Sequence, residues 1–243
     1  MGTLYLIPTP VGNMEDITLR ALRMLKEADI VLAEDTRTSG ILLKHHGINR
    51  RLVSHHKFNE HQAVDGIVEQ LKGGAVVALI SDAGTPAISD PGFLLVRQAV
   101  RAGVTVSALP GPTALVPAIV ASGLPCDRFV FEGFLPQKKG RMTRLAALTE
   151  EQRTMVFYES PHRLLKTLEQ LADTLGQERP ACVCREISKV HEDFQRGSLS
   201  HLVSHFSSTE PKGEIVIVVA GKDKSDTNKN IAEHEEDIVS HRH

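Results

Sequence analysis

Short apolar runs rich in β-branched residues alternate with longer amphipathic stretches through the first half of the chain. The apolar runs predict strands near 3–7, 29–33, 51–54, 75–80 and 104–108. The stretches between and after them place apolar residues at helical spacing and predict helices near 16–27, 37–46, 59–72, 91–102 and 112–121. Strands that alternate with helices are typical of βαβ units, so this half is predicted to be an α/β domain with a mostly parallel sheet.

The second half of the chain has more strands per helix. Strands are predicted near 129–134, 154–159, 181–187, 193–199 and 213–221, with helices near 141–151 and 161–175. Hairpin-like neighbours among these strands predict a mixed sheet. The predicted fold class is therefore α/β, with two α/β domains at 1–123 and 124–221, a cleft between them, and a polar, disordered tail at 222–243.

Composition narrows the class of protein. The chain has 243 residues, of which 41% are hydrophobic and 24% charged, as in ordinary globular proteins with a core. No apolar run reaches the roughly 18 residues of a membrane span, so no membrane partner is predicted. A net charge of −2 argues against a protein that coats nucleic acid generally, and three cysteines fit a cytoplasmic protein.

Five loops that follow predicted strands are unusually rich in polar, glycine and proline residues. They are 8–13, 34–38, 55–60, 81–92 and 109–113. In an open α/β sheet, ligands bind outside the carboxyl ends of the strands, so these loops predict one ligand site. The sequence contains neither GxGxxG after the first strand nor GxxxxGK[ST], which argues against a dinucleotide site and a P-loop kinase.

The loop SDAGTPAISDPG at 81–92 contains more glycine and proline residues than a simple turn requires. Gly84 lets the backbone approach a ligand closely, and Asp82 can accept a hydrogen bond from a ligand amino group. Asp90 and Pro91 are expected to cap the next helix, as N-cap and first helical residue. The loop LPGPTA at 109–114 is expected to bring the start of another helix to the same site.

Two further loops carry candidates for acid–base chemistry. AEDTRTSG at 33–40 fits either a capped helix with an internal ion pair or a polar cluster that orients a substrate hydroxyl, and the sequence leaves both open. SHHKFNEH at 54–61 has three histidines, but the spacing of His56 and His61 suits one helix face poorly and no cysteine lies nearby. No metal site is therefore predicted, and a substrate contact is favoured over a plain helix start, which Asn59 would cap.

Nine motifs occur together in one order and resemble a known family. They are GTLYLIPTPVGN, AEDTR, FNE, SDAGTPAISDPG, LPGPTA, FEGFLP, YESPHR, REISK and KGE, within residues 2–221. The set is similar to the ribosomal RNA small subunit methyltransferase I family, which has the tetrapyrrole-methylase fold. The resemblance implies S-adenosylmethionine as cofactor, bound between two α/β domains. It also implies methylation of the ribose 2′-hydroxyl of a decoding-region cytidine in 16S rRNA within the small ribosomal subunit, and a homodimer.

The resemblance also implies roles for particular residues. Cofactor contacts are expected from Asp82, Ala83, Gly84, Thr85, Ile88, Thr113, Ala114, Tyr158 and Ile187. Our candidates for the catalytic base are, in order, Asp35, Glu60 and His56. Contacts with RNA are expected from Arg37, Lys138, Lys139, Arg141, Arg144 and Lys189. Phe58 departs from the family, which commonly has a histidine there, so a mechanism that needs that histidine is in doubt.

Two alternatives remain open from the sequence. An enzyme of the same fold could methylate a tetrapyrrole or another small molecule, although the TPVGN loop differs from the glycine-rich turn with an aspartate that such enzymes usually carry. The second alternative is a cofactor-binding or ribosome-associated protein without enzymatic activity, which would bind its ligand but would not catalyse a reaction.

Overall fold

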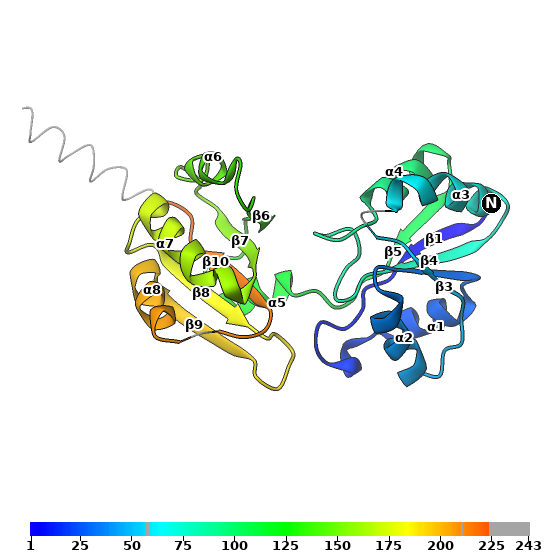
Figure 1. The fold of residues 1–243 in the computed structure, drawn as a ribbon, viewed down its shortest axis with the longest axis horizontal. Coiled ribbons are helices and arrows are strands. Elements are labelled where there is room, and N and C mark those ends of the chain that lie inside the picture. The colour runs from blue at the N-terminus through cyan, green and yellow to red at the C-terminus, as the bar shows by residue number, and fades with distance from the viewer. Residues whose placement is uncertain (57–58, 210, 224–243) are drawn as a thin grey trace, which may run out of the picture. The chain divides into compact units, whose positions relative to one another are not determined.

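The computed structural model describes residues 1–56, 59–209 and 211–223, and these form two compact units (Figure 1). The first unit is Met1–Ala114 and the second begins at Leu115. The boundary was expected after residue 123, but helix α5 (Leu115–Ser122) contacts strands of the second unit and belongs to it. Most of the tail expected at 222–243 lies outside the described residues. Within the described part of the chain, no helix is long and apolar enough to span a membrane.

The first unit contains a five-stranded sheet in the order β3-β2-β4-β1-β5. Its strands are β1 (Thr3–Leu6), β2 (Ile30–Ala33), β3 (Leu52–Ser54), β4 (Val76–Ile80) and β5 (Thr105–Ala108). Every neighbouring pair is parallel, which confirms the parallel sheet predicted from the alternation of strands and helices. All five carboxyl ends therefore lie along one edge of this sheet.

Helices cover both faces of this sheet (Figure 1). They are α1 (Leu19–Glu27), α2 (Thr36–His45), α3 (Glu60–Lys72) and α4 (Phe93–Arg101), and a short 3₁₀ helix, η1 (Met14–Asp16), precedes α1. Because successive strand residues point to opposite faces, Val77 and Leu79 pack with α3 and α4, whereas Ala78 and Ile80 pack with α1 and α2. This two-sided burial explains why β4 reads as an uninterrupted apolar run.

The second unit contains a five-stranded mixed sheet in the order β6-β7-β10-β8-β9. Its strands are β6 (Phe129–Phe134), β7 (Thr154–Glu159), β8 (Pro180–Arg185), β9 (Asp193–Ser198) and β10 (Ile215–Val219). Only β6 and β7 pair in parallel and the other neighbours are antiparallel, which confirms the predicted mixed sheet.

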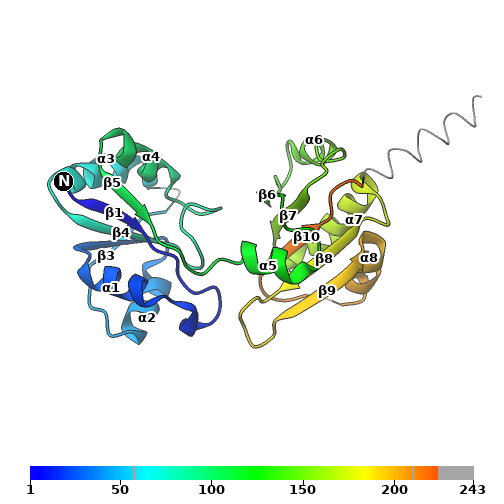
Figure 2. The same cartoon turned by 180° about the vertical axis from the view of Figure 1, so that it is seen from behind.

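The helices of the second unit pack on both faces of its sheet, as the reversed view shows (Figure 2). They are α5, α6 (Arg141–Ala146), the 3₁₀ helix η2 (Pro161–Arg163), α7 (Leu164–Leu175) and α8 (Leu199–Ser207). Side chains of α7 and α8 join one core cluster with alternate residues of β7, β8 and β10. The next residues of β8 face α5, where the Cys184 thiol lies 3.8 Å from the Ala118 carbonyl oxygen.

Helix α8 was not predicted. A strand is expected to end at residue 199, and no helix is expected after it. The Ser198 hydroxyl accepts a hydrogen bond from the His201 N–H and caps the helix, and Leu199, Leu202 and Phe206 form its buried stripe. Together with Val203, these residues are spaced i, i+3, i+4 and i+7, so the helical period was present in the sequence and the prediction overlooked it.

Candidate active site

Three of the polar loops of the first unit converge at the carboxyl edge of its sheet. Thr9 and Gly84 exchange backbone hydrogen bonds, with N···O distances of 2.9 and 2.8 Å. The Thr85 hydroxyl donates to the Pro112 carbonyl oxygen at 3.4 Å, and the Thr9 hydroxyl donates to the Ser81 carbonyl oxygen at 3.0 Å. The loops after β1, β4 and β5 are thus joined into one surface.

Glycines permit this close approach. Gly84 has a φ of +78°, and a Cβ added there would lie 3.5 Å from Val11 Cγ1 and 3.9 Å from Thr113 Cα. A Cβ on Gly111 would lie only 2.9 Å from Pro8 Cβ, so a larger residue there would push two of the loops apart. Ala83, Thr113 and Ala114 are half-buried at this junction.

The loop after β4 holds an exposed apolar side chain on a strained backbone. Ile88 is 41% exposed, and its neighbours Ala87 and Ser89 have φ values of 68° and 65°. Non-glycine residues in this conformation cost of the order of 1–3 kcal/mol each and gather at ligand sites. The strain and the exposed isoleucine together make this loop a candidate binding loop.

The expected cap of the following helix was wrong. Helix α4 begins at Phe93 and follows Gly92, whose φ is +132°, rather than starting at Pro91 behind an Asp90 cap. Glu60 supplies the cap instead, because its Oε1 accepts the N–H groups of Gly92 and Leu94, both at 3.1 Å. Glu60 therefore fixes the end of the binding loop through the positive end of a helix.

The segment before α3 also differs from expectation. Asn59 precedes α3, but its side chain makes no capping bond to that helix. Its amide accepts the His56 N–H at 2.8 Å and donates to the Ser54 carbonyl oxygen at 2.9 Å, so it closes the turn after β3. His55 is buried, and its Nε2 lies 3.9 Å from Glu60 Oε1. Burial lowers the pKa of His55, which favours its neutral form.

Replacing Glu60 separates a capping role from a base. We expect Glu60→Gln to keep the rate of the reaction implied by the motifs within about tenfold of wild type, because the amide oxygen still caps α4, whereas loss of a base would reduce that rate by about 10²–10⁴. Glu60→Ala is expected to lower the free energy of unfolding by about 0.5–2 kcal/mol. Urea denaturation and initial rates measure both effects, with Glu69→Ala, an exposed residue of the same helix, as control. Equal and large losses of rate in both Glu60 variants would instead support Glu60 as the catalytic base.

Asp35 is held in an ion pair. Its carboxylate caps α2 by accepting the Arg37 N–H at 2.8 Å, and it binds the Arg37 guanidinium with contacts of 2.6–3.2 Å. Of the two interpretations of this segment, the structure therefore has the capped helix with an internal ion pair. The Arg37 hydrogen bonds lower the pKa of Asp35 to about 2, which makes Asp35 a weak proton acceptor.

Two other carboxyl groups, Asp82 and Asp90, have pKa values that are raised rather than lowered. Asp82 follows β4, and its Oδ1 accepts the Asp35 N–H at 3.1 Å. Burial raises the pKa of Asp82. Burial, followed by repulsion from Glu34, raises the pKa of Asp90 to about 7, although the Ser81 hydroxyl opposes the shift. Sequence reasoning missed Asp90 as a titrating group because its position before Pro-Gly suggested a helix cap.

The structure offers no evidence for a metal at these loops. Among residues 1–56, 59–209 and 211–223, no three His, Cys, Asp or Glu side chains are grouped so as to hold an ion. His56 is half-buried at the turn after β3. Phe58, the departure from the family pattern, lies outside the described residues.

In the second unit, two expected cofactor contacts lie at one edge of the sheet. β10 pairs Ile215 with Glu159 of β7 on one side and with Arg185 of β8 on the other, so the carboxyl ends of β7 and β8 are level. Tyr158 is half-buried against Phe131 and Phe134, at ring distances of 5.0 and 5.7 Å.

The second of these contacts, Ile187, lies in a strained turn beyond β8. Ile187 is 8% exposed, between Glu186 and Ser188, whose φ values are 53° and 68°. Glu186 Oε1 accepts the Glu214 N–H at 2.9 Å and the Lys189 ammonium at 2.8 Å. Lys189 also lies 3.2 Å from Glu214, and these carboxylates raise the pKa of Lys189 although burial opposes the shift. Lys189, expected to contact RNA, thus holds the turn that carries Ile187.

The basic stretch 137–144 divides into exposed and engaged residues. Lys138 and Lys139 are exposed. Arg144 is half exposed, but Glu132 accepts its Nε and one terminal nitrogen at 2.6 and 2.7 Å. Arg141 is only 7% exposed, which argues against the expected contact with RNA.

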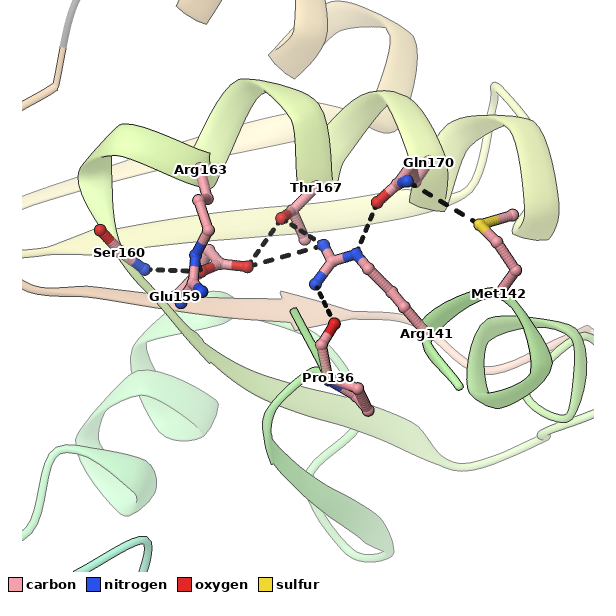
Figure 3. Close-up of polar contacts among 8 residues, drawn as sticks. All are labelled: Pro136, Arg141, Met142, Glu159, Ser160, Arg163, Thr167 and Gln170. Atoms are coloured by element: carbon pink, nitrogen blue, oxygen red, sulfur yellow. Dashed lines mark hydrogen bonds and ion pairs between the residues drawn. The ribbon is translucent and has the colours of Figure 1, made fainter. Parts of the chain in front are cut away.

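Arg141 belongs instead to a buried polar network around Glu159 (Figure 3). Its guanidinium donates to the Thr167 hydroxyl and the Gln170 amide oxygen, both at 2.7 Å, and to the Pro136 carbonyl oxygen at 3.2 Å. Glu159, 3% exposed, accepts hydrogen bonds from Thr167, Arg163 and the Ser160 N–H at 2.7–2.9 Å. The network ties α6 to α7 and to the end of β7.

Comparison with known proteins identifies the family of this chain. The family model for tetrapyrrole (corrin/porphyrin) methylases matches residues 3–203. The chain is 48% identical to ribosomal RNA small subunit methyltransferase I of Haemophilus influenzae, over 95% of this chain and 83% of that protein. The protein of the same name from Thermotoga maritima is 46% identical, over 92% of this chain and all of that protein.

Solved structures share the fold. Diphthine synthase superposes with a TM-score of 0.71 at 16% identity, covering 90% of each chain. Uroporphyrin-III-C-methyltransferase from Thermus thermophilus superposes with a TM-score of 0.63 at 24% identity, covering 90% of this chain and 94% of that one. The fold, the family model and the relatives together show that this chain belongs to the tetrapyrrole methylase family and, within it, to the ribosomal RNA small subunit methyltransferase I family.

Proposed function

We propose that this chain methylates the ribose 2′-hydroxyl of a cytidine in the decoding region of 16S rRNA, with S-adenosylmethionine as methyl donor. The substrate class rests on one observation. Over most of its length, the sequence of this chain is nearly 50% identical to relatives named as small subunit rRNA methyltransferases. The nucleotide and the position on the ribose rest on the motif resemblance.

The loops of the first unit fit the methionine end of this cofactor. Asp82 provides a carboxylate for an ammonium group, Thr85 a hydroxyl, and the exposed Ile88 an apolar contact. Gly84 lets the backbone approach, since its φ of +78° suits glycine. When bound, S-adenosylmethionine supplies a methyl group on a positively charged sulfur. For the second unit, the resemblance alone supports Tyr158 and Ile187 as contacts for the adenosine part.

The ribose hydroxyl must lose its proton as it becomes an ether, and Asp90 is the acceptor we propose. A pKa of about 7 lets Asp90 be ionised near neutrality and still bind a proton effectively. Asp35, first in our sequence ranking, suits the role less because Arg37 lowers its pKa to about 2. We assign Asp35 and Arg37 to holding the start of α2, and Glu60 to capping α4. His56 remains a proposed substrate contact.

Among the residues expected to contact RNA, Arg37 and Arg144 are exposed but paired with Asp35 and Glu132, and we propose that the exposed Lys138 and Lys139 bind RNA. We expect a Lys138→Ala/Lys139→Ala variant to bind small subunits more weakly at low salt. The slope of log affinity against log salt should fall by about 1.4 to 1.8, since each phosphate contact contributes about 0.7 to 0.9. Filter binding across a salt series measures this, with Lys72→Ala as a surface control. An unchanged slope would place the RNA elsewhere.

The experiment that tests the function is transfer of labelled methyl from S-adenosylmethionine to small ribosomal subunits, naked 16S rRNA and a tetrapyrrole precursor. We expect label in rRNA as 2′-O-methylcytidine. Label on the tetrapyrrole alone would favour the small-molecule alternative, and cofactor binding without transfer to any of them would favour the non-enzymatic one. The substrate places the proposed activity in the cytoplasm, and the homodimer implied by the resemblance is tested by sedimentation.

A further inference from the structure

Five exposed basic side chains gather where helices α1 and α2 end. They are Lys26 of α1, Lys44 and His45 of α2, and Arg50 and Arg51 of the segment that leads into β3. The two helices lie side by side on one face of the first sheet (Figure 1, Figure 2). We call these five residues the basic patch.

Contacts within the first unit hold the basic patch together. Ile48 belongs to the core cluster that α1 and α2 share, and the Arg50 guanidinium donates to the Lys26 carbonyl oxygen in the last turn of α1. Burial, followed by repulsion from His45 and Lys26, lowers the pKa of the half-buried His46. The positive charges of the two helix ends are therefore close enough to act on the same group.

The fold does not neutralise the charge of the basic patch. Among the residues that the structure describes, none of its lysine or arginine side chains has an ion-pair partner. Of the acidic residues beside it, Glu27 lies 3.9 Å from Arg23, and Asp29 accepts the Val76 N–H at 2.8 Å. The two helix C-termini carry about −0.5 each. Even with Asp29 counted, the four lysine and arginine charges leave a surplus of about +2 here, in a chain whose net charge is −2.

The composition of the basic patch indicates the class of its partner. The centre of a protein–protein interface is enriched in aromatic and apolar side chains, and sites for single-stranded RNA use aromatic side chains on which bases stack. The basic patch consists of lysine, arginine and one histidine. Exposed lysine and arginine side chains bind the phosphates of a nucleic-acid backbone and do not read its sequence.

The position of the basic patch indicates a large partner. Helix α2 joins the carboxyl end of β2 to the amino end of β3, so its last residues lie at the amino edge of the sheet, away from the candidate active site. Its 10 residues span about 15 Å. A single nucleotide or a small molecule bound at the carboxyl edge does not reach this far, whereas a folded RNA does.

We infer that the basic patch binds backbone phosphates of the ribosomal RNA at a distance from the nucleotide to be methylated. It is a second RNA-binding surface, on the first unit, in addition to Lys138 and Lys139 of the second unit. The basic patch adds affinity for the substrate, and the loops at the carboxyl edge select the nucleotide. This inference rests on the proposed function, because that function supplies the RNA partner.

A triple variant, Lys26→Gln/Lys44→Gln/Arg51→Gln, tests the inference by filter binding to small ribosomal subunits across a salt series. Arg50 is kept because it holds the end of α1. The slope of log affinity against log salt should fall by about 2.1 to 2.7, since each phosphate contact contributes about 0.7 to 0.9. Between about 50 and 200 mM salt, the affinity of wild type should therefore fall roughly 18- to 42-fold more than that of the variant.

Two further measurements keep this result interpretable. Arg51→Gln alone should lower the slope by about 0.7 to 0.9, so the test does not depend on the triple variant being folded. The Kd of the triple variant for S-adenosylmethionine should equal that of wild type, because the basic patch lies at the other edge of the sheet from the loops proposed to bind the cofactor.

The matched control is Lys72→Gln/Arg101→Gln/Lys166→Gln. It removes the same number of positive charges from exposed positions on α3, α4 and α7, outside the basic patch. We expect its salt slope to equal that of wild type. An equal fall of the slope in both triple variants would assign the effect to the net charge of the protein and overturn the inference.

The outcomes separate the two proposals. Wild-type protein that methylates rRNA, with an unchanged salt slope in the basic-patch variant, would overturn the second RNA surface and leave the proposed function standing. Loss of binding to vesicles of anionic phospholipid in that variant, again with an unchanged slope for subunits, would assign the basic patch to a membrane and also overturn the inference. Wild-type protein that binds subunits through the basic patch but transfers no methyl to rRNA would reject the proposed function and leave the RNA surface standing.

Discussion

Replacing Asp90 with asparagine is expected to lower the rate of methyl transfer by about 10²–10⁴, the usual contribution of a general base. The asparagine side chain keeps the size of the aspartate but accepts no proton. In wild type, the rate should rise with pH and level off above about 7, where Asp90 is ionised. The Asp90→Asn variant should lack this rise. Initial rates between pH 5 and 9 at saturating cofactor measure it.

The same carboxyl should also change stability with pH. The pKa of Asp90 in the folded protein, about 7, lies above its ordinary value of 3.8, so the folded state holds the proton more tightly than the unfolded state. The stability from this group is present below about pH 4 and is lost as the pH rises through 7. Between pH 5 and 8, the melting temperature of Asp90→Asn should therefore fall less than that of wild type.

An exposed acidic residue of the same unit provides the control for both measurements. Asp65 lies on the outer face of α3, and Asp65→Asn should change neither the rate profile nor the pH dependence of melting. A variant Asp90→Asn with full rate would remove Asp90 as the proton acceptor. It would return the choice to the candidates ranked from the sequence, Asp35, Glu60 and His56.

Replacing Glu159 with alanine is expected to lower the free energy of unfolding of the second unit by about 3–5 kcal/mol. Glu159 lies 3.7 Å from the buried Arg141, and its removal leaves that guanidinium buried without a carboxylate. An uncompensated buried charge is far more costly than a lost surface pair. The variant also loses acceptors for Thr167, Arg163 and the Ser160 N–H. Urea denaturation measures the change.

A double variant and a surface control show whether charge burial is the cause. Glu159→Ala/Arg141→Met removes both charges, so we expect it to recover much of the stability that Glu159→Ala loses. Glu150→Ala breaks the Lys222–Glu150 pair, whose carboxylate is 76% exposed, and should cost at most about 1 kcal/mol. A Glu159→Ala protein as stable as the Glu150→Ala control would show that the network contributes little.

Local pattern predicted much of this protein. The alternation of strands and helices predicted the parallel first sheet, and the denser strands predicted the mixed second sheet. Apolar spacing along a segment decides its period, and the carboxyl ends of parallel strands must share one edge. The loops around Thr9, Gly84 and Pro112 could therefore be expected to meet, and they do. The motifs that indicated the family lie in these same loops.

Partners distant in sequence could not be predicted in this way. Glu60 caps a helix that begins 33 residues later, and Arg141 reaches a carboxylate on β7, so both residues have structural partners that the sequence did not reveal. The raised pKa of Asp90 depends on burial and on Glu34 from another strand end. The sequence by itself determined most of the elements, the sheet types and the family, because these depend on local period and order. Only the tertiary structure decided which charged side chains are buried, which are paired and which are available for chemistry. Desolvation and ion pairing depend on residues that are distant in the sequence and become neighbours only in the folded protein.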